Sequence, residues 1–260
     1  TIEKLAALNG QPKDVKVLLQ VSVSNIICSI VIGKRFEHDD PFFVDLIKQL
    51  NIMMQYIMYV GLLTPFKQLS YLPGDLFYVK KWSKAAIKVN EMFSKAFIKT
   101  LKDTLKDDEE PDNFVTAYLQ EMKQLKDKGI HSNLSEANLI AIIRTLFLAG
   151  TETSGSTILW CILYMLHYPE IQEKVFSEIV TNVGTNRVPN MADRPKLTYL
   201  NAVIMETQRM ASLAPVGLRR EVGTTFEYRG FTFPKGSILW PVLESVHYDK
   251  KIWEDPTNFR

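Results

Sequence analysis

The segment at residues 147–157, FLAGTETSGST, places one carboxylate and five hydroxyl side chains inside an otherwise apolar run. Thr153 can donate its hydroxyl to the carbonyl four residues back, at Ala149, a habit of serine and threonine that bends helices. Gly150 lowers the local helix preference by about 1 kcal/mol relative to alanine. We therefore expect a distorted or π-bulged turn here, with Glu152 in an apolar setting where it can relay protons through a water.

Two other interpretations of this segment stay open. Gly150 and the triplet Gly155-Ser156-Thr157 imitate the frame of a phosphate-binding loop, although Ser156 stands where that loop has its lysine. Alternatively, the segment belongs to a strained core helix whose Glu152 pairs with an arginine elsewhere in the chain.

A second constellation is the sequence METQRM, in which Glu206 and Arg209 are three residues apart. This spacing puts both side chains on one face of a helix. If the pair is exposed, it stabilises the helix by only a few tenths of a kcal/mol.

The next polar group is a pair of adjacent arginines, Arg219 and Arg220, which follows a helix break at Pro215 and Gly217. Two guanidinium groups entering a strand can clamp a carboxylate or a phosphate. Exposed charges at a sheet edge are the alternative.

These groups need elements to position them, and the longest is a helix with Ser135 as its N-cap and no stop before Pro169. Between Glu136 and Glu170 its only charges are Arg144 and Glu152. About twenty apolar residues suffice to cross a bilayer, but a carboxylate and several hydroxyls near mid-membrane are costly. We favour a central buried helix over a membrane span.

The remaining pattern is mainly helical. Apolar residues at helical spacing predict further helices at residues 18–32, from Pro41 to about 58, 80–106 (amphipathic and lysine-rich), 112–128, 169–184 and 199–211. From Phe226 the period changes to short β-type runs around Gly230 and a Pro-Lys-Gly turn. The predicted fold class is mainly α, with a long central helix and a small antiparallel β-sheet near the C-terminal end.

Composition limits the function classes. The 260 residues are 46% hydrophobic and 23% charged, as in ordinary globular proteins, and a net charge of +2 gives no argument for nucleic acid. Cys28 and Cys161 both lie in apolar runs, which indicates unreactive thiols rather than a disulfide framework. The four histidines have no metal-ligand spacing: His38, His131, His167 and His247.

Five motifs follow one another along the chain: AGTETS (149–154), ETQR (206–209), P-x-G-x-x-R (215–220), FTFPKGSIL (231–239) and IWEDPTNFR (252–260). In this order and spacing they resemble cytochrome P450 monooxygenases. The stretch SNIICSIVIGKRF (24–36) is similar to the microsomal, family 2-like branch. The resemblance implies a partial cytochrome P450 fold, with residues 1–260 forming one catalytic domain truncated at both ends.

The resemblance also implies residue roles. Glu152 and Thr153 match the acid–alcohol pair that delivers protons to dioxygen, and Glu206 and Arg209 match a buried structural pair. The positions that match contacts with haem b are Ala149, Gly150, Thr153 and, for a propionate, Arg220. The positions that match a substrate pocket are Met53, Met54, Ile57, Thr145, Leu148, Ala149, Ala214, Pro215 and Leu218.

The implied function is a haem-dependent monooxygenase that inserts one atom of dioxygen into an apolar substrate, such as a xenobiotic, fatty acid or steroid. Its implied partners are NADPH-cytochrome P450 reductase and cytochrome b5, on the cytoplasmic face of the endoplasmic reticulum membrane. The segment from Tyr59 to Tyr78 matches a membrane-dipping region, and a buried connection is its other interpretation.

One departure concerns the iron. The family's haem ligand is a cysteine thiolate in a loop expected beyond Arg260, so no metal ligand is expected in this chain. Cys28 is expected on a distal helix, and Cys161 on the wrong side of the iron. The alternative to an enzyme is therefore a non-catalytic fragment that cannot ligate haem by thiolate.

Overall fold

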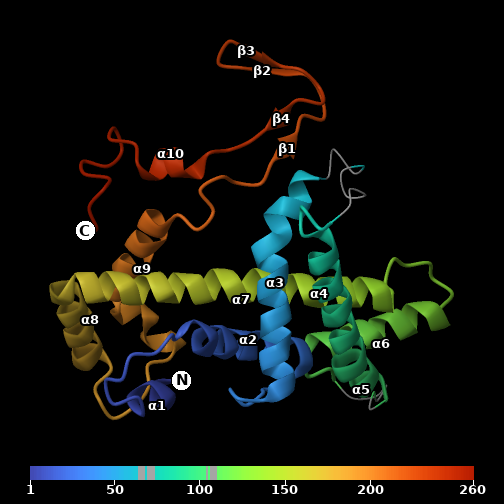
Figure 1. The fold of residues 1–260 in the computed structure, drawn as a ribbon, viewed down its shortest axis with the longest axis horizontal. Coiled ribbons are helices and arrows are strands. Elements are labelled where there is room, and N and C mark those ends of the chain that lie inside the picture. Colours follow the sequence, from blue (N-terminus) through green and yellow to red (C-terminus); the bar gives the residue numbers. More distant parts are fainter. Residues whose placement is uncertain (64–67, 69–73, 104, 106–109) are drawn as a thin grey trace. The chain divides into compact units, whose positions relative to one another are not determined.

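The computed structural model describes residues 1–63, 68, 74–103, 105 and 110–260, and the chain divides into two compact units, Thr1–Gly155 and Ser156–Arg260. In the first unit the elements are α1 (Ile2–Ala6), α2 (Lys16–Ile32), α3 (Pro41–Leu62), α4 (Val79–Met92), the π-helical segment η2 (Phe93–Lys99), α5 (Thr100–Asp103), α6 (Phe114–Asp127) and the first part of α7 (Glu136–His167). The second unit contains the end of α7 and then α8 (Pro169–Asn182), the 3₁₀ segment η3 (Met191–Lys196), α9 (Thr198–Ala211), β1 (Arg220–Glu221), β2 (Phe226–Tyr228), β3 (Phe231–Phe233), β4 (Ile238–Leu239) and α10 (Leu243–His247) (Figure 1).

Local capping explains where the helices of the first unit begin and end. Asp40 accepts a hydrogen bond of 2.9 Å from the backbone N–H of Phe43, and the proline that follows Asp40 opens α3. Asn113 caps α6 in the same way through the N–H of Thr116. Gly33 ends α2 with a left-handed φ of 68°. The helices predicted in this part of the chain are confirmed.

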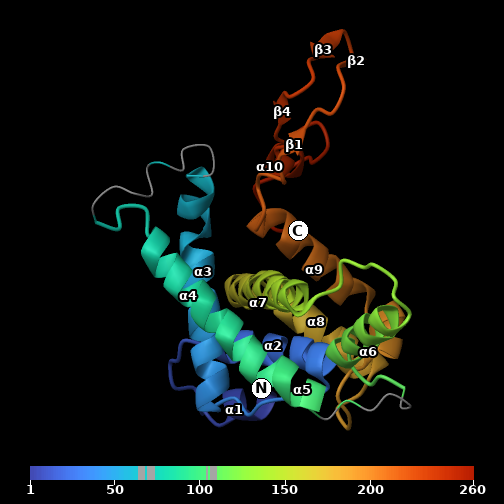
Figure 2. The same ribbon diagram turned by 90° about the vertical axis from the view of Figure 1, so that its right-hand side faces the viewer.

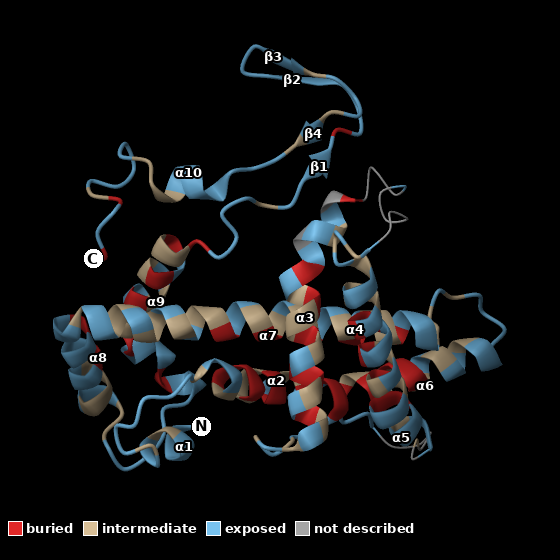
Figure 3. Cartoon of the chain, in the orientation of Figure 1, coloured by how far each residue is buried: buried red, intermediate tan, exposed pale blue. Residues whose placement is uncertain are grey.

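The core of the first unit lies where the helical hairpin of α3 and α4 crosses α2 and α7, as Figures 1 and 2 show. At its centre Phe93 and Phe97 contact Phe147 of α7, with ring centroids 5.1 and 6.1 Å apart. Buried positions gather on α2, α3 and α4 in Figure 3. This aromatic packing fixes the first part of α7 against the hairpin.

The amphipathic helix predicted over residues 80–106 is present as α4, η2 and α5 up to Asp103, and residues 104 and 106 lie outside the described residues. Its π-helical turn, Phe93–Lys99, buries Phe93, Phe97 and Ile98. The prediction of a π-bulged turn at Gly150 is wrong, because α7 is one uninterrupted α-helix from Glu136 to His167.

In the second unit, a small apolar cluster joins α8, α9 and the C-terminal residues. Val175 of α8, Val203 of α9 and Phe259 belong to it. The ring of Phe259 stacks on Tyr164 of α7, with centroids 4.4 Å apart. The end of the chain is thus part of this unit's packing.

The strands of the second unit form two separate antiparallel pairs. In the pair β1–β4, Arg220 lies opposite Leu239; in the pair β2–β3, Phe226 lies opposite Phe233. The predicted fold class, mainly α with a small antiparallel sheet, is therefore confirmed, with the sheet divided in two.

By length and composition α7 is able to cross a membrane. Its most apolar stretch of 18 residues has a mean hydropathy of 1.2, and 22% of that stretch is buried. The prediction of a central buried helix holds for only one stripe of α7 in the first unit, made of Leu139, Ile143, Phe147, Thr151 and Gly155. The membrane-contact prediction for the segment from Tyr59 to Tyr78 falls partly outside the described residues, at 64–67 and 69–73.

Candidate functional site

The first unit's part of α7 has two distinct faces. Successive turns bury one stripe, made of Leu139, Ile143, Phe147, Thr151 and Gly155. A second stripe of small side chains, Thr145, Ala149 and Thr153, repeats at the same interval of four and is exposed. The segment at residues 147–157 thus has one side in the core and one side exposed.

The side chains of the exposed stripe project little from the helix, because both threonines bond carbonyls of their own helix. Thr153 donates its hydroxyl to the carbonyl of Ala149 at 2.6 Å, and Thr145 donates to Ala141 at 2.8 Å. The bond expected for Thr153 is therefore confirmed. It forms within a regular helix.

The two glycines of the segment lie toward α2. A Cβ at Gly150 would be 2.8 Å from Cδ1 of Ile27, and one at Gly155 would be 3.4 Å from Cγ of Gln20. These glycines let α2 and α7 approach closely. This close packing, and not a distorted turn, is their structural reason.

Glu152 lies in a polar setting, so the apolar surroundings expected for it are wrong. Its Oε2 accepts a hydrogen bond of 2.5 Å from Nε2 of Gln20, and its Oε1 lies 3.5 Å from Nζ of Lys16. The Glu152 side chain is 23% exposed and that of Lys16 is 46% exposed. The charge partner is thus a lysine on the rim of the unit, and not an arginine.

A third contact joins the same two helices one turn along. Ser24 of α2 and Thr151 of α7, both buried, share a hydrogen bond of 2.7 Å. Each of the two hydroxyls is thereby satisfied in the interior. Two hydroxyls of the segment therefore differ in role: Thr151 takes part in helix packing, and Thr153 belongs to the exposed stripe.

The predicted pocket residues of the first unit differ in exposure. Met53 is fully buried in the core, Met54 and Leu148 are half-buried, and Ile57 is exposed. Met53 therefore fills the core between the helices. Met54 and Ile57 are the two predicted positions on α3 that a ligand can reach from outside the core.

A cavity of about 810 Å³ in the first unit lies away from all of these residues. It lies between α5, α6 and the start of α7, and is lined by Lys102, Leu105, Leu119, Met122, Lys123, Lys126, Ile130, Ser132, Leu134, Ser135 and Glu136. Since it shares no residue with the predicted site, it has no part in the argument for that site.

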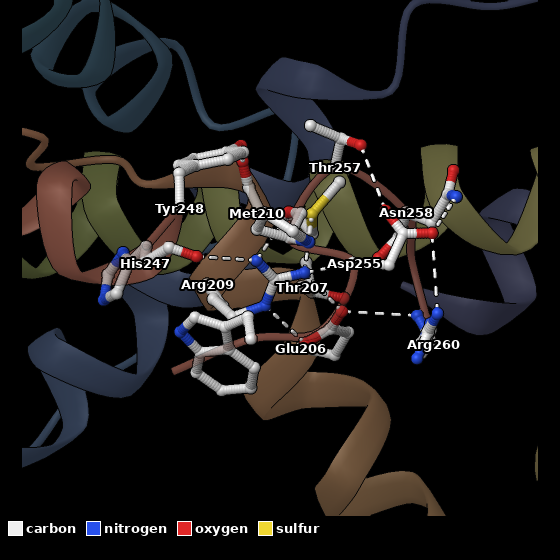
Figure 4. Close-up of polar contacts among 12 residues, drawn as sticks. Glu206, Thr207, Arg209, Met210, His247, Tyr248, Asp255, Thr257, Asn258 and Arg260 are labelled. Atoms are coloured by element: carbon white, nitrogen blue, oxygen red, sulfur yellow. Dashed lines mark hydrogen bonds and ion pairs between the residues drawn. The ribbon is translucent and has the colours of Figure 1, made fainter. Parts of the chain in front are cut away.

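In the second unit Glu206 and Arg209 form a buried ion pair, shown in Figure 4. Nε of Arg209 donates to Oε2 of Glu206 at 2.8 Å and Nη2 donates to Oε1 at 2.6 Å. The side chain of Arg209 is 5% exposed and that of Glu206 is 12% exposed. The hydrogen bond with Glu206 raises the pKa of Arg209, so its charge is permanent.

The same guanidinium holds the end of α10 and the chain that follows it. Nη1 donates to the carbonyls of His247 and Pro256, each at 2.8 Å, and Nη2 to that of Asn258 at 3.3 Å. The indole of Trp253 lies over it, 4.8 Å away. Sequence reasoning missed these partners; Trp253, within the motif IWEDPTNFR, was the available signal.

The remaining predicted residues of the second unit are all exposed: Ala214, Pro215, Leu218 and Arg220. Arg220 does begin a strand, as expected. A guanidinium in this position is accessible to a carboxylate ligand.

The cysteines do not offer a thiolate in the first unit. Burial raises the pKa of the Cys28 thiol to about 12, so it stays protonated. Cys161 is half-buried on α7. Within the described ranges, no three His, Cys, Asp or Glu side chains gather as a metal site.

Comparison with known proteins adds to this geometry. The family model for cytochrome P450 matches residues 1–260. The chain is 37% identical to cytochrome P450 2J3 of Rattus norvegicus and to cytochrome P450 2J2 of Homo sapiens, in each case over 99% of this chain and 51% of the relative. It is 35% identical to cytochrome P450 2U1 of Homo sapiens, over 93% of this chain and 44% of the relative. The chain therefore spans about half the length of the curated relatives it matches, and it belongs to the cytochrome P450 family.

Proposed function

We propose that the complete protein is a monooxygenase that inserts one atom of dioxygen into an apolar organic substrate. The observation that supports it is on α7: Thr153, on the exposed stripe, follows Glu152 in the sequence, and the Glu152 carboxylate lies 3.5 Å from the half-exposed ammonium of Lys16. A hydroxyl next to a carboxylate with access to water is a suitable pair for general acid–base work.

Family membership implies haem b as the cofactor of the complete protein. The exposed stripe of Thr145, Ala149 and Thr153 fits the distal side of such a group, because small, folded-back side chains let a flat ring approach. Arg220 would pair with a propionate. Gly150 would act indirectly, by seating α7 against α2. Bound haem supplies the centre at which dioxygen is activated.

The chain's own residues would manage the protons. The oxygen atom that is not inserted leaves as water, so protons must reach the site from solvent. Glu152 holds one carboxylate oxygen beside Lys16, where a proton can enter. Thr153, oriented by its bond to Ala149, would then present its Oγ to the reacting side and pass a proton on.

The substrate would contact the predicted pocket positions that remain accessible. These are Met54 and Ile57 on α3, Thr145, Leu148 and Ala149 on α7, and Ala214, Pro215 and Leu218 after α9. Thioether and aliphatic side chains suit an apolar substrate such as a xenobiotic, fatty acid or steroid. Electrons would come from an NADPH-dependent reductase, with cytochrome b5 as a further partner.

We also place the complete protein on the endoplasmic reticulum membrane, with its cytoplasmic face as the site of reductase binding. The proposal rests on the few charges between Tyr59 and Tyr78. Both units would belong to one catalytic domain.

The proposal is tested with the complete haem-loaded protein, a reductase and NADPH. With isotopically labelled dioxygen and a long-chain fatty acid or steroid panel, we expect one labelled oxygen atom in the product. Products without the label, in a preparation that consumes NADPH and contains bound haem, would refute the proposal.

A further inference from the structure

Gln20 is a buried amide that touches the proposed acid. Its side chain belongs to α2 and is 1% exposed. Nε2 donates to Oε2 of Glu152 at 2.5 Å and also to Oδ1 of Asn51, on α3, at 3.0 Å. Both N–H bonds of this amide therefore have a partner.

Asn51 completes a reciprocal pair of amides. Its Nδ2 donates to Oε1 of Gln20 at 3.0 Å. The pair by itself would be equally satisfied if both amides were turned over. Glu152 removes this freedom, because the turned amide would point an oxygen at a carboxylate. The contacts thus fix which atom of Gln20 faces Glu152.

The two oxygens of Glu152 consequently have different surroundings. Oε2 is held by a buried neutral donor, while Oε1 lies beside the half-exposed ammonium of Lys16. An amide N–H neither supplies nor takes up a proton near neutral pH. Proton exchange is therefore restricted to the Oε1 side, while Gln20 holds Oε2 in place.

We infer that Gln20 is a positioning residue for Glu152, and that Asn51 fixes the orientation of Gln20. The inference rests on the proposed function, since it assigns Glu152 a proton to deliver. These hydrogen bonds connect three helices. Asn51 of α3, the helix that carries Met54 and Ile57, bonds Gln20 of α2, and Gln20 bonds Glu152 of α7. Loss of the Gln20 donor would remove the hydrogen bond that holds Oε2 of Glu152 and leave its ion pair with Lys16.

The first test uses the 260-residue chain without haem. Infrared spectra of chain with isotope-labelled glutamate, taken as differences against Glu152→Gln, isolate the carboxylate bands of Glu152. We expect Gln20→Leu to shift these bands toward those of a water-exposed carboxylate, and Asn51→Leu to shift them in the same direction by a smaller amount. Ser24→Ala is the matched control: it removes a buried α2–α7 hydrogen bond that does not involve Glu152. Unchanged bands in Gln20→Leu would overturn the inference.

The second test uses the complete haem-loaded protein and measures peroxide released per dioxygen consumed. We expect Gln20→Leu to raise this ratio severalfold at unchanged substrate affinity, and Ser24→Ala to leave it unchanged. If Glu152→Gln leaves the ratio unchanged, the proposed role of Glu152 fails. If Glu152→Gln raises it but Gln20→Leu does not, only the inference fails. Should Gln20→Leu not fold, Asn51→Leu decides by the same criteria.

Discussion

The carboxylate of Glu206 and the guanidinium of Arg209 meet in two parallel hydrogen bonds, of 2.6 and 2.8 Å, between successive turns of α9. The pair is more than a helix-surface contact, because Arg209 also donates to the carbonyl of His247, the last residue of α10, and to two backbone carbonyls after α10. The backbone N–H of Arg260 in turn donates to Glu206 at 3.2 Å. One buried pair thus anchors a stretch of chain that has little regular structure of its own.

Replacing Arg209 by methionine should destabilise the protein strongly. It leaves the largely buried Glu206 carboxylate, 12% exposed, without its counter-charge and three carbonyls without the Arg209 donor, a loss we expect to be about 3–5 kcal/mol. Urea unfolding gives the free energy, and limited proteolysis should show earlier cleavage after α10. Arg260→Met is the control, since among the described residues its exposed side chain bonds Glu254 and Asp255, both at the surface, and the substitution should cost less than about 0.5 kcal/mol. Equal effects of the two substitutions would contradict the anchoring role.

Replacing Thr153 by alanine should uncouple dioxygen reduction from product formation in the complete protein. The variant loses the hydroxyl that the proposed relay needs, while α7 keeps its backbone bonds. We expect a general acid–base loss on the order of tenfold or more in product per NADPH, with peroxide rising in compensation. Thr153→Ser, which keeps the hydroxyl, should retain most of the coupling. Unchanged coupling in Thr153→Ala would remove Thr153 from the relay.

The close approach of α7 to α2 predicts an interaction between substitutions at Gly150 and Ile27. Alanine at Gly150 gains about 1 kcal/mol of helix preference but brings its Cβ within 2.8 Å of Ile27 Cδ1. Ile27→Val removes that methyl group. We therefore expect Gly150→Ala to stabilise the Ile27→Val background by about 1 kcal/mol more than it stabilises the parent. Chemical denaturation of the four proteins in this cycle measures the difference, and strict additivity would contradict the contact.

The decrease of the unfolding free energy at acid pH should depend on Glu178. This α8 carboxylate accepts hydrogen bonds from the backbone N–H groups of Tyr199 and Leu200, at 2.7 and 2.9 Å, and thus caps the start of α9. Desolvation acts to raise the pKa of Glu178, but these bonds outweigh it and the net pKa lies below the ordinary 4.5.

Because the folded-state pKa of Glu178 is the lower one, its contribution to stability is fully present above about pH 4.5 and is lost as the pH falls through the folded value. We expect Glu178→Gln to reduce the dependence of the unfolding free energy on pH in this acid range. Glu173→Gln, on the exposed face of the same helix, should leave the dependence as it is. Parallel pH profiles for the parent and Glu178→Gln would disprove the capping role.

Features that depend on neighbours along the chain were predictable from the sequence. The helix caps at Asp40 and Asn113, the back-bond of Thr153 and the pairing of Glu206 with Arg209 all join residues at most four positions apart. Helix geometry brings such groups together wherever the helix lies, so residue type and spacing suffice. The order of the motifs, which indicated the family, is likewise a property of the chain alone.

The tertiary structure decided the surroundings of Glu152. Its partner Gln20 is 132 positions away, and only the packing of α2 against α7 brings the two together. The same packing explains Gly150, whose role as a helix-weakening residue was misjudged because the contact with Ile27 is invisible in the local sequence. The π turn lies in α4–α5, where Phe93 and Phe97 must both reach the core. Contacts between helices depend on how the helices cross, and crossing geometry results from packing side chains from the whole unit.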